Sequence, residues 1–223
     1  MGFTSFTKFF LVILFPLALF LSVAYFVGFD YSFYEGKFND YDIYSRVENA
    51  DLINTKTLEF LNGRSEKIPD DYNEREKHHL WDVRELVAYL KYFLYFVIAL
   101  FIVFLIYTGI RLKIKGFILG FFGKIFFYGG ILTLAISLFA LLLISLNFDL
   151  SFEIFHRIFF DKGSYMFDPS NEMIVNLYPE DLFRDIGLNI SLWVVIFSVI
   201  SAFAGFLLIR FFGGKNIKSP GKY

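Results

Sequence analysis

Four long apolar stretches constrain the fold of this chain more than any other feature of its sequence. They cover about residues 9–29, 86–110, 117–148 and 190–212. A helix that crosses a bilayer needs about 20 largely apolar residues, and each stretch meets that length. Hydrophobic residues make up 57% of the chain, a share above that of soluble domains. We therefore predict an all-α membrane protein, one integral membrane domain with four transmembrane helices.

Charged residues are divided unequally between the two ends of these predicted spans. All 22 acidic residues fall in the two long connecting segments, residues 30–85 and 149–189. The other end carries only basic residues, namely Lys8, Arg111, Lys113, Lys115, Lys124, Arg210, Lys215, Lys218 and Lys222. Positive residues mark the cytoplasmic side of a membrane. We therefore expect both termini in the cytoplasm, with a basic tail at 213–223, and two extracytoplasmic loops.

The first span is predicted to be retained as a helix. The apolar region of a cleaved signal peptide is only about 7–15 residues long, and this stretch is longer. Lys91 lies within the second span, near its outer end, and is interpreted as an anchor whose long side chain reaches the polar surface.

Short helices are expected in the outer loops. One is predicted over residues 48–61, ending at Asn62-Gly63. Another is expected to begin near Pro69 and to continue without a break into the second span. The stretch DYSFYEGKFNDYDIY at 30–44 has no clean period, and its aromatic rings suit the headgroup layer of a membrane.

All three histidines lie near the outer ends of predicted spans. In EREKHHLWDVREL, Glu76, His79 and Asp82 follow one another at intervals of three and share a helical face. Asp82 is also four residues from His78, whereas His156 follows the third span and returns to the same membrane surface. This placement alone is compatible both with an active site and with a polar interface.

Two separated motifs carry a resemblance. E-x-x-H-[ML]-x-D-V is met by Glu76, His79, Leu80, Asp82 and Val83. F-H-x-x-F-F, followed by W-x-F-D-P and I-x-x-x-x-P, is met by Phe155, His156, Phe159, Phe160, Phe167, Asp168, Pro169, Ile174 and Pro179. With the span count and the two outer loops, the chain resembles the four-span membrane family that includes the bacterial lipoprotein intramolecular transacylase, Lit. It departs from that pattern at Tyr165, where tryptophan is usual, and at Glu172, where aspartate is usual.

The resemblance implies a multi-pass cell-membrane acyltransferase whose active site lies at the extracytoplasmic face. Its substrate would be a lipoprotein whose N-terminal cysteine carries a diacylglyceryl group in the outer leaflet, among membrane lipids. The sn-2 acyl chain would move to the α-amino group of that cysteine, giving an N-acyl lyso-form lipoprotein. His79 and His156 would be the catalytic residues; no cofactor, metal or nucleic acid is expected.

Histidine titrates near pH 6.5 and suits both halves of such a transfer. We assign His79 as the general base, oriented by Asp82, and His156 as the group that protonates the leaving alkoxide or polarises the carbonyl. The reverse assignment stays open. Residues expected to support them or contact the substrate are Glu76, Arg75, Asp168 and Tyr165. Asp168 is expected to order the second loop, and His78 to be an interface residue.

Two other classes of protein remain as alternatives. A non-catalytic membrane scaffold or assembly factor could bind a partner through the tyrosine-rich first loop. A metalloprotein could use His78 or His79 with Asp82 and His156. No local spacing of histidines supports the metal site, and the chain has no cysteine to provide thiolate ligands or a thiol nucleophile.

Overall fold

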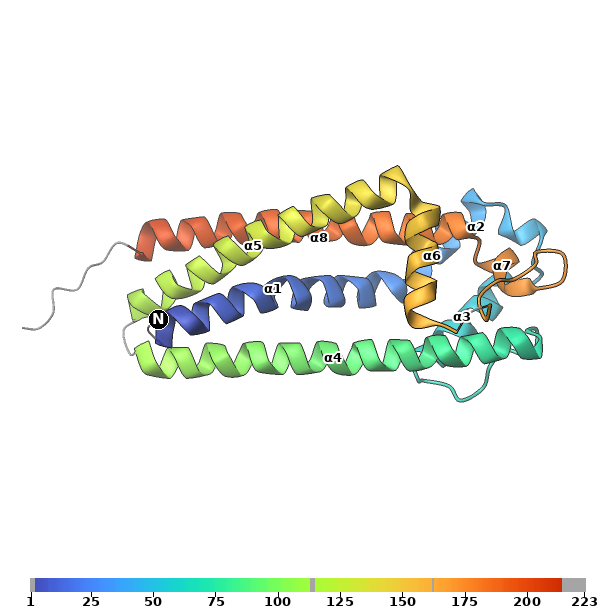
Figure 1. Ribbon diagram of the computed structural model, residues 1–223, viewed down its shortest axis with the longest axis horizontal. Coiled ribbons are helices and arrows are strands. Elements are labelled where there is room, and N and C mark those ends of the chain that lie inside the picture. The colour runs from blue at the N-terminus through green and yellow to red at the C-terminus, as the bar shows by residue number, and fades with distance from the viewer. Residues whose placement is uncertain (1–2, 113–114, 162, 214–223) are drawn as a thin grey trace, which may run out of the picture. The chain divides into compact units, whose positions relative to one another are not determined.

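The computed structural model describes residues 3–112, 115–161 and 163–213, and the regular elements of these ranges are all helices. Their order is α1 (Phe3–Gly28), α2 (Tyr31–Asp40), η1 (Ile43–Ser45), α3 (Ala50–Leu61), α4 (Glu74–Leu112), α5 (Lys115–Leu146), α6 (Phe148–Phe159), α7 (Met173–Leu177) and α8 (Glu180–Phe212) (Figure 1). The prediction of an all-α chain is confirmed for these residues. The predicted basic tail, apart from Gly213, lies outside the described residues.

Among the described residues, four helices are long and apolar enough to cross a membrane, which agrees with the predicted number of spans. They cover Ser5–Gly28, Glu74–Arg111, Ile118–Leu146 and Glu180–Phe212. The second and fourth begin well ahead of the apolar stretches at 86 and 190, because the polar turns before these stretches are helical too. The side of the membrane on which each end lies stays a prediction.

The chain divides into two compact units. The first consists of Met1–Phe20, Leu94–Phe139 and Leu192–Tyr223, and the second of Leu21–Phe93 and Ala140–Ser191. In the first unit, segments of α1, α4 and α5 pack around a small core of Leu11, Phe121 and Ile125. Many of its other large apolar side chains are exposed, as a lipid-facing helix requires.

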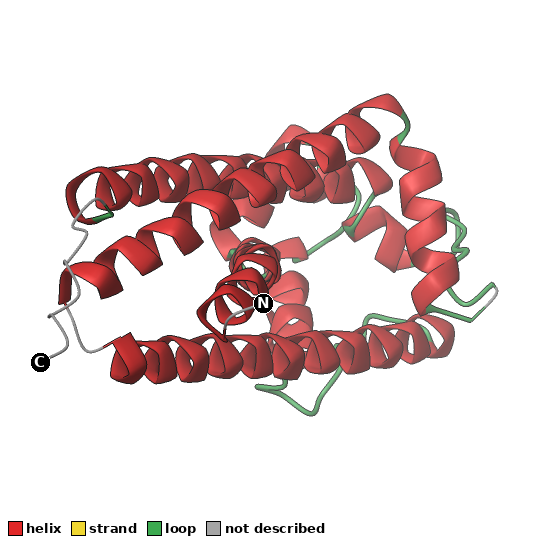
Figure 2. Cartoon of the chain, turned by 60° about the vertical axis from the view of Figure 1, so that its left-hand side comes forward, coloured by secondary structure: helices red, strands yellow, loops and turns green. Residues whose placement is uncertain are grey.

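Glycines bring α5 and α8 close together in the first unit. A Cβ atom at Gly205 would lie 2.3 Å from the backbone nitrogen of Phe127, and one at Gly130 would lie 2.8 Å from that of Ala202. Small residues at a helix interface permit this approach in membranes. Figure 1 shows α5 crossing α8 at an angle, and Figure 2 shows the bundle of helices from another side.

The second unit contains the folded outer loops. Its core combines α2, η1, α3 and α7 with the polar end of α4, and includes Tyr34, Phe38, Ile53, Phe60 and Leu177. The expectation that the rings of residues 30–44 lie in the headgroup layer is wrong for Tyr34 and Phe38. These two side chains are one helical turn apart on α2 and are buried in protein, because α2 forms behind the Asp30 cap.

Residue Asn62 ends α3 as predicted, and Gly63 follows with a φ of 76° that suits glycine. Lys91 Nζ donates to the Asn62 carbonyl oxygen at 2.9 Å, and the Tyr25 hydroxyl donates to Asn62 Oδ1 at 3.0 Å. Lys91 therefore binds the C-terminus of α3, in addition to any anchoring role that its position indicates. A cation here also complements the negative end of the helix dipole.

We expect Gly205→Ala to destabilise the first unit by about 1–3 kcal/mol, the usual cost of overpacking, because the new methyl group would overlap the backbone of α5. Thermal unfolding in detergent micelles measures this change. Gly109→Ala in α4 is the matched control, since a Cβ there meets no atom within 4 Å. Equal melting temperatures for the two variants would contradict the close packing described for α5 and α8.

Candidate functional site

The two motif histidines lie together in the second unit. His79 on α4 and His156 on α6 have ring centroids 6.4 Å apart, and their planes are inclined by only 22°. Their exposed fractions are 7% and 9%. The adjacent His78 is exposed on the surface instead. The fold thus brings together His79 and His156, which are 77 positions apart in the sequence (156 − 79). It also separates buried His79 from its exposed neighbour His78.

Aromatic rings enclose the histidine pair. Phe160 lies 4.9 Å from the His79 ring and 5.5 Å from the His156 ring, so it touches both. Phe167 lies 5.3 Å from His79, and Tyr165 lies 4.8 Å from His156. Tyr165, which stands where relatives usually have tryptophan, therefore supplies an aromatic face at the site. Such surroundings remove water and favour the neutral form of both imidazoles.

The tautomer of His156 is fixed by the backbone of its own helix. Its Nδ1 lies 2.8 Å from the carbonyl oxygen of Phe152, which can only accept, so Nδ1 carries the proton. The lone pair of the neutral ring is then on Nε2. Burial lowers the pKa of His156, while the hydrogen bond to Phe152 opposes this effect. His156 is therefore a neutral imidazole with one defined basic nitrogen.

The environment of His79 differs from that of His156. Among the described residues its buried Nδ1 has no hydrogen-bond partner, and a polar atom left in that state costs about 1–3 kcal/mol. His79 lies in the charged turn ahead of the apolar stretch that starts at Leu86. Burial, with smaller contributions from His156, His78 and Arg75, lowers its pKa to about 4. The ring is neutral at pH 7 and a weak base.

Asp82 does not orient either histidine through a hydrogen bond among the described residues. It is half-buried on α4 and lines a surface pocket of about 490 Å³. The lining also includes Glu85, Tyr89, Arg157, Phe160 and Asp161. Phe160 is thus shared by the pocket and the histidine pair. The spacing of Asp82 from His79 placed them on one helical face, but that spacing did not determine which atoms meet.

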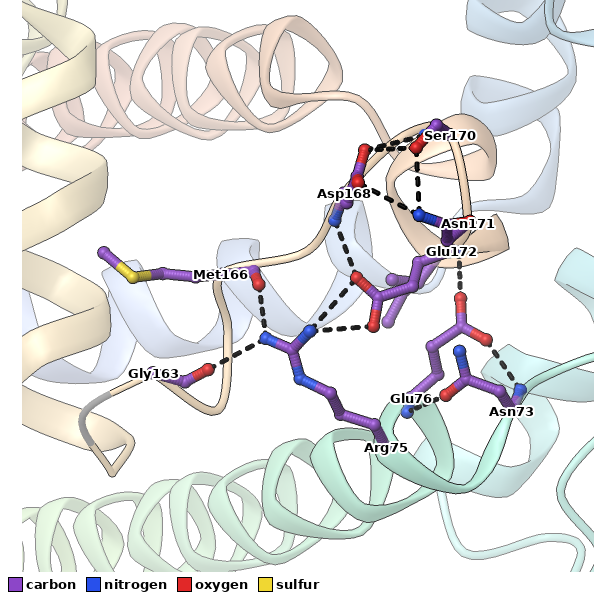
Figure 3. Close-up of polar contacts among 10 residues, drawn as sticks. Asn73, Arg75, Glu76, Gly163, Met166, Asp168, Ser170, Asn171 and Glu172 are labelled. Atoms are coloured by element: carbon purple, nitrogen blue, oxygen red, sulfur yellow. Dashed lines mark hydrogen bonds and ion pairs between the residues drawn. The ribbon is translucent and has the colours of Figure 1, made fainter.

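Arg75 joins α4 to the second loop. Its Nη1 donates to both carboxylate oxygens of Glu172, at 2.9 and 3.2 Å, and its Nη2 donates to the carbonyl oxygens of Gly163, at 3.0 Å, and Met166 (Figure 3). The guanidinium also lies over the ring of Phe167, 4.9 Å from its centroid. Arg75 thus holds the segment that places Phe167 against His79.

Glu76 is buried, and its carboxylate accepts hydrogen bonds from backbone N–H groups at the starts of two helices, α4 and α7. Its Oε2 accepts from the backbone nitrogen of Asn73 at 2.6 Å, while Asn73 Oδ1 accepts from the Glu76 nitrogen, which forms a capping box for α4. Its Oε1 accepts from the backbone nitrogen of Ile174 in α7 at 2.7 Å (Figure 3). Glu76 therefore supports the site through hydrogen bonds to the backbone.

Asp168 orders the second loop, as the sequence predicts. Its carboxylate accepts from the backbone nitrogen and hydroxyl of Ser170 and from the side chain of Asn171. These bonds to Ser170 lower the pKa of Asp168. Its own backbone nitrogen donates to Glu172 at 2.6 Å. The turn at Asp168 therefore positions the Glu172 carboxylate next to Arg75.

Sequence reasoning missed the pairing of Glu172 with Arg75 and the contact of Phe160 with both histidines. Glu172 and Phe160 both fell within the motif segments, but no local sequence feature indicated which residues they contact. Within the described residues, no group of three or more histidine, aspartate or glutamate side chains is arranged to hold a metal ion.

These features define a helical membrane protein with four candidate spans and a buried, aromatic-lined histidine pair. The model of the family described as lipoprotein intramolecular transacylase Lit matches residues 8–183, most of the chain. The chain belongs to this family, and is accordingly a multi-pass membrane transferase of the lipoprotein transacylase type.

Individual relatives are distant. An uncharacterised protein of Aquifex aeolicus is 28% identical over 166 residues, which cover 74% of this chain and 71% of that protein. The solved structure of Lit from Bacillus cereus is 19% identical, with a TM-score of 0.77 over 93% of this chain and 96% of that one. Two histidine variants of the Bacillus protein, to arginine and to alanine, give TM-scores of 0.73 and 0.74. The fold is therefore shared with Lit.

We expect Glu76→Ala to lower the free energy of unfolding by about 2–4 kcal/mol, because two backbone N–H groups lose a charged acceptor. Thermal unfolding in micelles measures the loss. Glu74→Ala, which removes only an exposed partner of Lys77, should change stability by less than about 0.5 kcal/mol. A similar effect of the two substitutions would show that the link between α4 and α7 is unimportant.

The lowered pKa of His79 predicts acid sensitivity in a defined range. The unfolded chain takes up a proton at this residue near pH 6.5, whereas the folded chain does so near pH 4. Between these two pH values the unfolded state binds more protons than the folded state. The contribution of neutral His79 to the free energy of unfolding is therefore complete above pH 6.5 and is lost as the pH falls towards 4. The loss is at most about 3 kcal/mol. Unfolding of wild type and His79→Gln between these pH values measures it; identical pH dependence would refute the prediction.

Proposed function

We propose that this protein transfers the sn-2 acyl chain of a diacylglyceryl-modified lipoprotein to the α-amino group of its N-terminal cysteine. The observation that carries the proposal is the buried histidine pair, in which one ring has a fixed basic nitrogen and the other has an unpartnered buried nitrogen. Family membership supports the reaction type. The product would be an N-acyl lyso-form lipoprotein, formed at the extracytoplasmic face.

In this proposal His156 is the general base, which reverses the assignment made from sequence. Its Nε2 lone pair is the defined acceptor for a proton, and the Phe152 carbonyl stabilises the imidazolium that forms. His79, with a pKa near 4, is too weak a base to compete for the amine proton. Neutral imidazole is nevertheless a good hydrogen-bond donor to a carbonyl oxygen.

The reaction then balances without a covalent enzyme intermediate. The amine nitrogen attacks the sn-2 ester carbonyl carbon, and its proton passes to His156 Nε2. The N–H of His79 donates to the oxyanion that develops on the carbonyl oxygen. The bond to the glycerol oxygen breaks as His156 returns the proton to that oxygen. An amide and a free sn-2 hydroxyl result.

Asp82 has a different role in this proposal from the one inferred from spacing. It lines the pocket that shares Phe160 with the histidines, where a carboxylate suits an incoming α-ammonium group. The amine must lose a proton before it attacks, and with a pKa of about 8 it does so readily. Because amine and ester belong to one molecule, holding both near the pair supplies part of the catalysis through proximity.

Tandem mass spectrometry of a lipoprotein's N-terminal peptide tests the proposal. The protein is expressed in a host that lacks N-acylation of lipoproteins. Intact mass does not suffice, because intramolecular transfer conserves it; fragments must show which atom carries the acyl chain. We expect an amide-linked acyl chain and a monoacyl glyceryl fragment with wild type, and at least about 100-fold less of this product with His79→Ala or His156→Ala.

His78→Ala is the matched control, because His78 is adjacent in sequence but exposed, and it should retain activity. If folded wild-type protein leaves the diacylglyceryl peptide unchanged, the proposed reaction is wrong. Full transfer by both alanine variants of the pair would remove the catalytic role of these histidines. If the protein acts in the cell without any acyl transfer, the alternative is favoured, a scaffold that binds a partner through the first loop.

A further inference from the structure

Helix α6 carries two parallel stripes of opposite character. Leu150, Ile154 and Ile158 follow one another at intervals of four residues, and so do Asp149, Glu153 and Arg157. Residues four apart lie on nearly the same line along a helix, so one stripe is apolar and its neighbour is charged. His156 is on neither stripe.

The apolar stripe of α6 is not covered by the protein. Leu150, Ile154 and Ile158 have exposed fractions of 50%, 47% and 68%. Within the charged stripe, Arg157 forms an ion pair with Glu153. His156 faces the aromatic enclosure on the other side of the helix. Helix α6 therefore presents three faces, and only the apolar one lacks a partner that suits it.

A sharp corner fixes the position of this helix along the chain. The candidate span of α5 ends at Leu146, α6 begins at Phe148, and Asn147 alone joins them. The Asn147 side chain accepts from the Leu150 nitrogen at 3.1 Å and so caps the new helix. One residue spans less than about 4 Å, so the start of α6 cannot leave the depth at which α5 ends.

The exposed apolar surface continues around that corner. Leu142, Leu143 and Leu146 in the last two turns of α5 are exposed, and Leu150 is the next residue of this surface beyond the Asn147 cap. Both views show α6 lying across the direction of the N-terminal part of α4 (Figures 1 and 2). A helix of 12 residues is about 18 Å long and cannot cross a bilayer.

We propose that α6 lies in the plane of the membrane surface, with its apolar stripe among the lipid acyl chains and its charged stripe in the headgroup layer. The partner of the exposed face is thus the phospholipid bilayer itself. Amphipathic helices of this kind sink about 5–10 Å into the boundary between headgroups and acyl chains. Asn147 and Asp149, which lie between Leu146 and Leu150, are also exposed and would lie in the headgroup layer.

This placement sets the depth of His156. The ester carbonyls of a glycerolipid lie at the boundary between headgroups and hydrocarbon, within about one helix diameter of the imidazole, which faces away from the apolar stripe. The enzyme would then meet the sn-2 ester without lifting its substrate from the bilayer. This last step rests on the proposed function, whereas the membrane contact of α6 rests only on its stripes and its corner.

Fluorescence quenching by brominated lipids tests the membrane contact without any measurement of catalysis. The full chain carrying Trp81→Phe and Trp193→Phe is reconstituted into phosphatidylcholine vesicles, and a single tryptophan is placed by Ile154→Trp or by Asp149→Trp. These positions belong to the apolar and charged stripes, respectively. We expect blue-shifted emission and roughly twofold stronger quenching at position 154 than at 149.

The position of bromine on the acyl chain gives the depth. We expect bromines near the ester end to quench Ile154→Trp more than bromines near the methyl end. Emission of Ile154→Trp that is red-shifted and unquenched would overturn the proposal, because the face would then lie in water. Blue-shifted but unquenched emission would also overturn it, because another protein surface would then cover the face. Stronger quenching from the methyl end would also overturn it, because α6 would then be deep in the bilayer. Tryptophan is itself apolar, so the substitution preserves the character of the stripe.

Discussion

The carboxylate of Glu172 accepts hydrogen bonds from the guanidinium of Arg75 and from the Asp168 backbone, and the rest of the site depends on these bonds. They connect the first turn of α4 to a loop nearly a hundred residues later. The guanidinium also binds two carbonyl oxygens of that loop and covers Phe167. One ion pair thus determines the conformation of the segment that encloses the histidines.

Glu76 complements this ion pair on the same turn of α4. Arg75 binds the loop through side-chain and carbonyl oxygens, and Glu76 binds the start of α7 through a backbone nitrogen. Both acids, Glu76 and Glu172, are buried and fully engaged, which is the condition under which a buried charge is tolerated. Losing Arg75 would leave the buried carboxylate of Glu172 without its cation and with only the Asp168 backbone N–H as a donor. The two outer loops are therefore expected to lose their mutual order together.

Much of the fold follows from local sequence. The spans follow from apolar runs, and the end of α3 follows from Asn62-Gly63. The approach of His79 to His156 agrees with the prediction that both lie at one membrane surface. Two features do not follow from local sequence. The start of α4 at Glu74 depends on a cap. The Arg75–Glu172 pair joins positions 97 apart. The lack of a hydrogen bond between Asp82 and either histidine among the described residues also escaped prediction, since spacing gives a shared helical face but the approach of α6 decides which atoms meet.

The aromatic enclosure of the histidines bears on the choice between two acceptors. Water at an activated ester would release a free fatty acid, and the chain would then behave as a lipase. Phe160 packs against both His79 and His156, and Phe167 packs against His79, so both rings reduce the room for water beside the pair. The α-amino group, which is tethered to the same lipid as the ester, does not need to diffuse past these rings. In the proposed reaction, partition between amide and acid would therefore be governed by these two phenylalanine rings.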